Sequence, residues 1–312
     1  MYKSSLTIAI FVILFSKQIL ASQQTLENRV SSVLDNTTVQ WLDGKLTSLN
    51  DYREGKPLYL KFWASWCQPC RQQMPHLQNT YEKYGSKLKM LALNINVNES
   101  IDKITDTRKE FSLTVPIAID MKGELSHGFK LMGTPYHVLI AKDGKILYKG
   151  HKLSKKLDDT IALLTKDTKI TVSGVEPGQL TEVSSVAEVD NVNRVLLFTS
   201  TWCDDYFKDS RPEMSKNCIK AQYAVNNLFS QFPDYQWRGI ISRMWTGETE
   251  LNDYKAKYSI RHPVEIDLSN QLYRKYNINT FPTLVVLKQG NEVFRTTNFN
   301  DLTNIRQALK SK

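Results

Sequence analysis

The segment Trp-Cys-Gln-Pro-Cys at residues 66–70 places two cysteines three positions apart. It lies between an apolar run of strand type and residues 72–84, whose apolar positions have helical spacing, so the pair is expected in the first turn of a helix. Unpaired backbone N–H groups and the helix dipole favour a thiolate at Cys67, and a thiolate is the species that attacks a disulfide. The pattern therefore predicts thiol–disulfide exchange, with Cys67 as the nucleophile and Cys70 as the resolving thiol.

Two other kinds of site use paired cysteines. A zinc site needs two further Cys or His ligands at suitable spacing, and although His76 is close in sequence, no second pair accompanies it. A purely structural disulfide is the other alternative. The order strand, Trp-Cys-x-x-Cys, helix favours redox chemistry over both, and we expect no metal site.

The elements that must position this pair occur twice in the chain. The run LYLKFWASWC at 58–67 aligns with RVLLFTSTWC at 194–203. Each copy continues to an X-Pro pair (residues 134–135 and 281–282), a strand, a turn signal, a second strand and a terminal helical pattern over 155–165 or 302–310. In the first copy, residues 88–97 form an expected strand and 101–111 an expected helix, with Ser100 as N-cap. The alternation predicts an α/β fold in which each copy has a mixed central sheet flanked by helices.

The length of the chain and its first residues predict two domains preceded by a signal peptide. With 312 residues, two domains are expected, and Gly and Pro residues near position 174 mark a boundary between 23–173 and 174–312. Residues 1–22 have the layout of a cleaved signal peptide: a basic start, the apolar run LTIAIFVILF and a small-residue end. That run is about half of a membrane span, although an uncleaved N-terminal anchor remains the alternative. We therefore expect a periplasmic or otherwise exported protein, in a compartment where disulfides persist.

The net charge of +9 is not concentrated in one part of the chain. Residues 23–172 carry 22 basic and 16 acidic side chains and residues 191–312 carry 17 and 12, so the positive charge is spread over both halves. No run of Lys and Arg and no basic and aromatic stripe is present, so we expect no nucleic-acid partner.

The first copy resembles the TlpA/ResA-like group of exported thiol–disulfide oxidoreductases, which have the thioredoxin fold. The resemblance rests on FWASWCQPCR at 62–71, Met-Pro at 74–75, Thr-Pro at 134–135 and the Asp-Gly turn at 143–144. It implies that Pro135 is preceded by a cis peptide and faces the disulfide, and that Trp66, Thr134 and Pro135 bind the substrate strand. An ordinary trans proline at the start of an edge strand is the alternative.

Two residues depart from, or add to, the thioredoxin pattern. Thioredoxin has a buried Asp six residues before the first cysteine, and this chain has Lys61 there. We expect Lys61 to extend to solvent, although its charge would also lower a nearby thiol pKa. Glu99 is a candidate acid near the cysteines, although we expect it to lie in a loop with its side chain exposed to solvent.

The second copy lacks the cysteine pair, since Tyr206 stands where the resolving cysteine would be. Its remaining cysteines are Cys203 and Cys218, and we expect them to form a disulfide, because two free thiols are unusual in an oxidising compartment. Ser210 is the expected N-cap of the following helix, which places Cys218 about two turns inside it. Pro282 is a second cis-proline candidate, by its resemblance to the thioredoxin turn.

By family resemblance the expected reaction is reduction of disulfides in other exported proteins. We expect no organic cofactor, because the electrons travel through the thiols themselves. A reductase in this compartment needs an upstream thiol electron donor, expected in the membrane. The alternatives are a disulfide oxidase or isomerase, and a non-catalytic metal chaperone or adapter.

Overall fold

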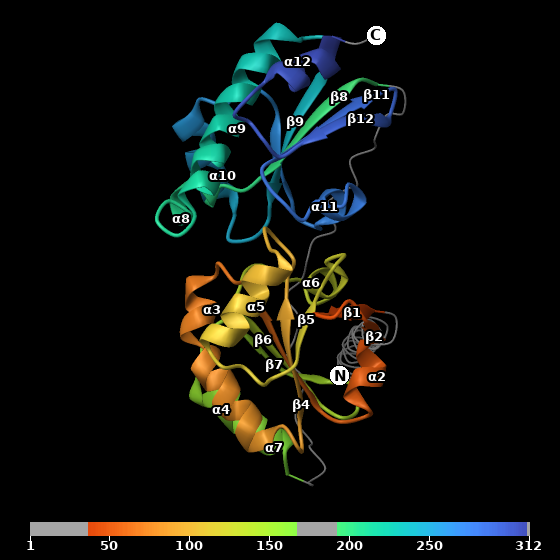
Figure 1. Cartoon of the computed structure of the whole chain (residues 1–312), viewed down its shortest axis with the longest axis vertical. Coiled ribbons are helices and arrows are strands. Elements are labelled where there is room, and N and C mark those ends of the chain that lie inside the picture. Colours follow the sequence, from red (N-terminus) through yellow and green to blue (C-terminus); the bar gives the residue numbers. More distant parts are fainter. Residues whose placement is uncertain (1–36, 167–191, 311–312) are drawn as a thin grey trace, which may run out of the picture. The chain divides into compact units, whose positions relative to one another are not determined.

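The computed structural model describes residues 37–166 and 192–310. These residues form two α/β domains, each built around one mixed sheet with helices packed on it (Figure 1). Each domain is described by itself. Within the described residues, no helix combines the length and the apolar composition needed to cross a membrane. The expected signal peptide (residues 1–22) and the expected domain boundary near residue 174 lie outside the described residues.

The first domain contains a seven-stranded sheet in the order β2-β1-β5-β4-β3-β6-β7. Its strands are β1 (Thr38–Trp41), β2 (Leu46–Ser48), β3 (Leu58–Trp63), β4 (Lys89–Asn94), β5 (Ile117–Ile119), β6 (Tyr136–Ile140) and β7 (Ile146–Gly150). β3 is parallel to β4 and antiparallel to β6, and every residue of β3 is buried. A strand buried on both faces reads as a nearly continuous apolar run, and Lys61 is the one charged residue within it.

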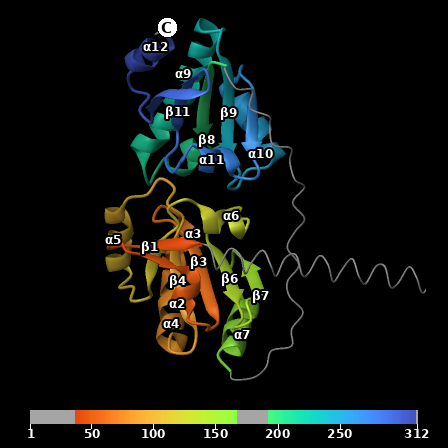
Figure 2. The ribbon, with the colours of Figure 1, turned by 90° about the vertical axis from the view of Figure 1, so that its right-hand side faces the viewer.

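The helices of this domain are α2 (Leu49–Arg53), α3 (Gln68–Gln72), α4 (Met74–Tyr84), α5 (Ile101–Glu110), α6 (Glu124–Gly128) and α7 (Lys155–Leu164). β6, β7 and α7 follow one another at one side of the domain, with α4 next to α7 (Figure 2). His76 of α4 pairs with Asp158 of α7 at 2.9 Å, and Arg71 of α3 pairs with Glu110 of α5. These two ion pairs connect α4 to α7 and α3 to α5, which places the four helices in one layer.

The second domain contains a five-stranded sheet in the order β10-β9-β8-β11-β12. Its strands are β8 (Arg194–Thr199), β9 (Gln236–Ser242), β10 (Val264–Asp267), β11 (Thr283–Lys288) and β12 (Asn291–Thr296). Strands β8 to β10 are parallel, and β11 and β12 are antiparallel to their neighbours. The first domain has the same arrangement in β5-β4-β3-β6-β7. The expectation of tandem thioredoxin-like α/β domains is confirmed.

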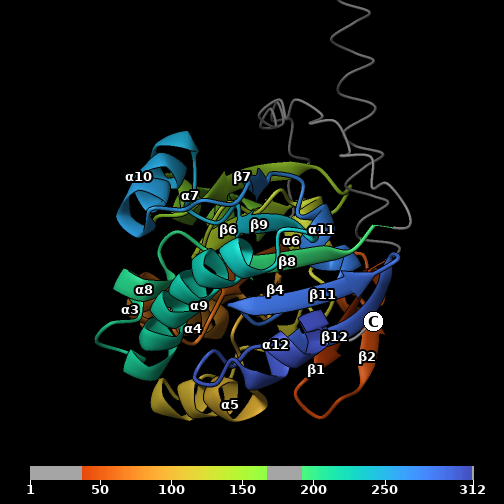
Figure 3. The same ribbon diagram turned by 90° about the horizontal axis from the view of Figure 1, so that it is seen from above.

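The second-domain helices are α8 (Cys203–Tyr206), α9 (Pro212–Gln231), α10 (Glu248–Tyr258), α11 (Gln271–Lys275) and α12 (Thr303–Lys310). α9 and α12 lie along the same face of β8 and β11 (Figure 3), where Leu197, Val225 and Leu309 belong to one apolar core. α10 covers the neighbouring part of that face against Ile241 of β9. Right-handed crossovers between parallel strands that advance in one direction place both connecting helices on one face.

The structure differs from the sequence expectations at some element ends. The helix expected over 72–84 is interrupted at Gln73, which separates α3 from α4. The strand expected over 88–97 is shorter, because the chain turns away after Asn94. The expectation of Ser210 as N-cap is wrong: α9 begins at Pro212 and Arg211 is its N-cap, because proline with its fixed φ occupies the first helical position. Ser100 does cap α5, accepting the Lys103 N–H at 3.3 Å.

Both domains contain an acidic cap that the sequence analysis missed. Asp120 follows β5 and its carboxylate accepts the backbone N–H groups of Leu125 (3.2 Å) and Ser126 (2.7 Å) at the start of α6. Asp267 at the end of β10 accepts the N–H groups of Gln271 (3.0 Å) and Tyr273 (2.9 Å) at the start of α11 in the same way. Burial raises the pKa of both carboxyl groups, and the backbone donors act in the opposite direction. The repeated Ile-Asp pair was the available signal.

Candidate active site

Cys67 and Cys70 form a disulfide at the start of α3, with their Cα atoms 5.2 Å apart. β3 delivers the chain to Cys67, which is the N-cap residue of α3, and the Cys70 N–H donates to the Cys67 Sγ at 3.2 Å. The Arg71 N–H donates to the Cys67 carbonyl at 3.1 Å. On reduction, the Cys70 N–H would face a Cys67 thiolate, which lowers the cost of the charged form.

The loop between β3 and the cysteines is held by residues that follow β4. The Ser65 N–H donates to the Glu99 carboxylate at 2.6 Å, and the Trp66 indole N–H donates to the Val97 carbonyl at 2.7 Å. The expectation that Glu99 is a solvated loop residue is therefore wrong, because its carboxylate accepts a backbone bond two residues before Cys67. These two bonds fix the residues that lead directly into Cys67.

The peptide bond between Thr134 and Pro135 is cis. β6 begins at Tyr136, which lies opposite Phe62 at the far end of β3. Because β6 runs antiparallel to β3, the start of β6 lies beside the end of β3 that leads to the cysteines. Thr134 and Pro135 therefore lie at the same end of the central strands as Cys67. Thr134 is buried, and its hydroxyl has no hydrogen-bond partner among the described residues.

Lys61 lies in β3 between Ala92 of β4 and His137 of β6, and its side chain has no exposed surface. The expectation that it extends to solvent is wrong. Its ammonium therefore lies in the core of the domain, in a strand that is buried along its whole length. The Nζ atom has no hydrogen-bond partner among the described residues, and burial lowers the pKa of Lys61 to about 7.

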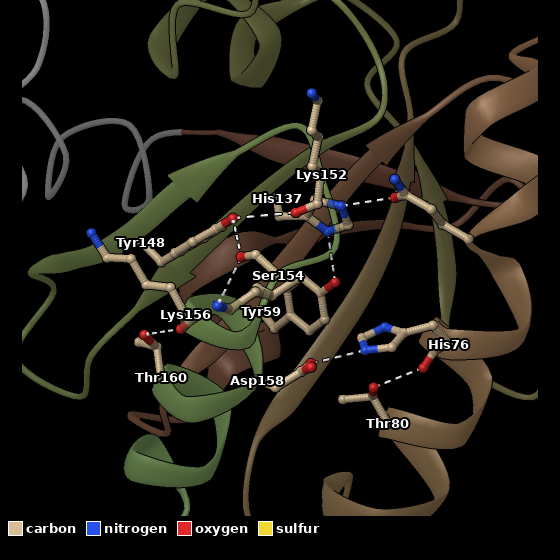
Figure 4. Close-up of polar contacts among 12 residues, drawn as sticks. Tyr59, His76, Thr80, His137, Tyr148, Lys152, Ser154, Lys156, Asp158 and Thr160 are labelled. Carbon is tan, nitrogen blue, oxygen red and sulfur yellow. Dashed lines mark hydrogen bonds and ion pairs between the residues drawn. The ribbon is translucent and has the colours of Figure 1, made fainter.

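A buried histidine joins this face of the sheet to the active-site helix. The Tyr59 hydroxyl lies 2.7 Å from His137 Nδ1 (Figure 4). The other ring nitrogen, His137 Nε2, lies 2.9 Å from the Gln73 Oε1. Burial, followed by the charge of Lys61, lowers the pKa of His137 to about 3, so the ring is neutral. The sequence analysis gave His137 no role. Its contacts depend on strand pairing, and one sequence alone gives no signal of that kind.

The corresponding region of the second domain has a different chemistry. Cys203 begins α8 and forms a disulfide with Cys218 inside α9, with Cα atoms 6.1 Å apart. The pairing agrees with the sequence expectation. Beside Cys203, the buried Asp204 accepts a hydrogen bond from the Tyr258 hydroxyl and pairs with the Lys257 ammonium at 2.8 Å. The peptide bond before Pro282 is cis, as in the first domain.

None of the described residues form a group of three or more His, Cys, Asp or Glu side chains able to hold a metal ion. The groups that converge on the first domain's site are thiols, backbone N–H donors and a cis-proline loop. This set suits nucleophilic exchange between sulfur atoms.

Comparisons with known proteins agree with this chemistry. Residues 30–149 match the model of the AhpC/TSA family. The thiol-disulfide oxidoreductase ResA of Bacillus thuringiensis subsp. konkukian (strain 97-27) is 33% identical over 133 residues, which cover 42% of this chain and 75% of ResA. The chain belongs to the ResA-like thiol–disulfide oxidoreductases.

Another relative of this ResA-like chain is the thioredoxin-like protein YneN of Bacillus subtilis (strain 168). It is 32% identical over 129 residues, which cover 40% of this chain and 75% of YneN. Among solved structures, StoA from Bacillus subtilis is 25% identical with a TM-score of 0.36, covering 42% of this chain and 96% of StoA. The family assignment thus describes a thiol–disulfide oxidoreductase domain within a longer chain, and confirms the enzyme class that the motif predicted.

Proposed function

We propose that this protein is exported and reduces disulfide bonds in other exported proteins through the Cys67–Cys70 dithiol. The observation that carries the proposal is the position of Cys67 as N-cap of α3, where its sulfur already accepts the Cys70 N–H at 3.2 Å. A sulfur in that position is stabilised as a thiolate, the form needed for attack.

The reaction takes place in two exchanges. The Cys67 thiolate attacks one sulfur of the substrate disulfide, forming a mixed disulfide and releasing the other substrate sulfur as a thiolate, which takes up a proton from water. Cys70 then loses its proton to water and attacks the Cys67 sulfur. This forms the Cys67–Cys70 disulfide and releases the second substrate sulfur as a thiolate, which also takes up a proton from water. The substrate thus gains two electrons and the enzyme loses two.

The cis-proline loop would orient the substrate. Thr134 and Pro135 lie at the sheet edge that holds Cys67, where the backbone of an extended substrate strand would pair with the loop. Trp66 would form the adjacent part of the same surface. This arrangement brings the substrate disulfide in line with the nucleophile.

Export is supported by the layout of residues 1–22, with a basic start and a short apolar run. In an oxidising compartment the dithiol must be regenerated, so we propose a membrane-bound thiol electron donor that reduces the Cys67–Cys70 disulfide. The donor supplies two electrons and two protons for each substrate disulfide reduced.

The reduction potential of the Cys67–Cys70 pair tests the direction of the reaction. The full-length protein would be equilibrated with glutathione buffers of defined potential and the oxidised fraction measured by thiol alkylation and mass spectrometry. A value near that of thioredoxin, about −270 mV, supports a reductase, whereas a value near about −120 mV identifies an oxidase and overturns the proposal.

Metal titration tests the rival idea of a chaperone. Stoichiometric metal binding that is lost in Cys67→Ser, together with no turnover of protein disulfides by the wild type, would identify a metal-binding protein. Turnover of disulfides without such binding supports the oxidoreductase.

A further inference from the structure

A continuous chain of hydrogen bonds connects the interior of the first sheet to the cis-proline loop. It passes from the Tyr59 hydroxyl to His137, from His137 to the Gln73 side chain, and from Gln73 to the His151 carbonyl at 3.2 Å. His151 Nδ1 then lies 2.8 Å from the Pro135 carbonyl. The chain therefore joins β3, the junction of α3 and α4, the end of β7 and the start of β6.

The direction of every bond follows from the groups involved. A carbonyl oxygen only accepts, so His151 Nδ1 donates to Pro135, and the Gln73 amide nitrogen donates to the His151 carbonyl. The Gln73 Oε1 is then an acceptor, which requires a proton on His137 Nε2. Since His137 is neutral, its Nδ1 has no proton and accepts from the Tyr59 hydroxyl. Each donor meets an acceptor, and only one tautomer of His137 satisfies the chain.

Gln73 occupies the central place in this chain. It is the residue at which α3 ends and α4 begins, and its own N–H donates to the Cys70 carbonyl at 3.1 Å. One side of its amide binds β6 through His137, and the other side binds the His151 backbone. The residue next to Gln73, Gln72, has an exposed side chain and serves as a matched control.

We propose that Gln73 is a positioning residue that holds the Cys67–Cys70 helix at a fixed spacing from the cis-proline loop through His137 and His151. The inference rests on the proposed function and adds a specificity to it. A protein substrate must meet the nucleophile and the loop together, so its reaction depends on that spacing. A small disulfide meets the cysteine alone, so its reaction does not.

The test compares Gln73→Ala, His151→Ala and Gln72→Ala in the full-length reduced protein, with insulin as the protein disulfide and 5,5′-dithiobis(2-nitrobenzoate) as the small one. We expect Gln73→Ala to slow insulin reduction about 10- to 100-fold relative to Gln72→Ala, with the small disulfide reacting within about two-fold. In the double variant Gln73→Ala/His151→Ala, the loss should not exceed that of the slower single variant, because both break one chain.

A spectroscopic readout separates positioning from a general loss of stability. The ¹⁵N resonances of His137 should show a neutral ring protonated at Nε2 in the wild type and in Gln72→Ala, and a mixture of tautomers in Gln73→Ala. An imidazolium or an Nδ1-protonated ring in the wild type overturns the inference. If Gln73→Ala does not fold, Gln73→Glu supplies the same rate comparison, since it keeps the acceptor for His137 and lacks the donor to His151.

The two proposals fail in different ways. Equal rates for Gln73→Ala and Gln72→Ala with both disulfides, or an equal loss with both, overturn the positioning role and leave the reductase in place. Failure of the wild-type protein to reduce either disulfide overturns the proposed function itself.

Discussion

Lys61 and His137 lie opposite each other on adjacent antiparallel strands, and both side chains are buried. Two basic groups thus share one site on the face of the sheet that is joined to the active-site helix. Burial lowers the pKa of each, to about 7 for Lys61 and about 3 for His137, and the charge of Lys61 adds to the effect on His137. The histidine has hydrogen-bond partners on both ring nitrogens, whereas the ammonium of Lys61 has none among the described residues.

Replacing Lys61 with methionine should stabilise the protein, because methionine fills a similar volume without burying an unpaired charge. We expect the free energy of unfolding of Lys61→Met at about pH 6 to exceed that of the wild type by about 2–4 kcal/mol. Urea denaturation of both full-length proteins measures the difference. A variant less stable than the wild type at this pH would show that the ammonium is stabilised in the core.

The same pair of proteins should differ in pH dependence. The pKa of Lys61 is about 7 in the folded state against 10.5 for the free side chain, so below pH 7 both states hold the proton and the burial cost is complete. Between these values the unfolded state binds a proton that the folded state has lost, and wild-type stability rises by up to about 1.4 kcal/mol per pH unit. The advantage of Lys61→Met should therefore shrink as the pH rises from 7 towards 10. An unchanged advantage at high pH would contradict the lowered pKa.

Replacing the resolving cysteine should trap the first intermediate. Cys70→Ser retains Cys67 at the N-cap of α3, so it still attacks a substrate disulfide, but no second thiol releases the product. We expect a mixed disulfide between Cys67 and the substrate, seen by mass spectrometry without reductant. Cys67→Ser is the control and should form no adduct; equal trapping by both variants would contradict the assignment of the nucleophile.

The Cys203–Cys218 disulfide should resist reduction under conditions that reduce the Cys67–Cys70 pair. Cys218 lies inside α9 rather than at its start, so it lacks the unpaired N–H groups of a helix N-terminus that would stabilise a thiolate leaving group. Differential alkylation across a dithiothreitol series measures both pairs in one sample. Simultaneous reduction of the two pairs would show that the second disulfide is also redox-active.

Removing that disulfide should destabilise the second domain. A bridge across 15 residues restricts the unfolded chain, and its loss in Cys203→Ser/Cys218→Ser should cost about 3 kcal/mol. Urea denaturation compared with the wild type measures the loss. No change in the unfolding transition would show that helix packing alone holds α8 against α9.

The sequence predicted the features that depend on local pattern. The Trp-Cys-x-x-Cys motif, the strand–helix alternation and the repeat of that alternation from residue 194 are all visible in residues close together in the sequence, and the structure contains them. The pairing of Cys203 with Cys218 was also predictable, since these were the cysteines left outside the motif. The Asp caps could also have been predicted, because Asp120 and Asp267 each follow an Ile and each lie 15 residues before the proline of a cis-proline pair.

The features that the sequence did not predict depend on which strands pair in the sheet. Lys61 lies in a central strand that is buried along its whole length, and the pairing that makes β3 central joins Lys61 to residues 31 and 76 positions away. His137 and Gln73 meet for the same reason. A charged residue in an apolar run has two physical outcomes, extension to solvent or burial with a lowered pKa, and only the position of the strand in the sheet decides between them.

The Gln78 side chain should contribute more to stability than any polar neighbour on the exposed side of α4. It is buried, its Oε1 accepts the Thr114 N–H at 2.8 Å, and its Nε2 donates to the Glu82 carboxylate at 2.8 Å. These bonds fix the segment that leads into β5 against α4.

Gln78→Ala leaves the Thr114 N–H without its acceptor, so we expect a loss of about 1–3 kcal/mol in the free energy of unfolding. Asn79→Ala, at the exposed position next to it, is the matched control, and urea denaturation of the two variants measures the difference. Equal stability of the two variants would show that water replaces the glutamine amide at no cost.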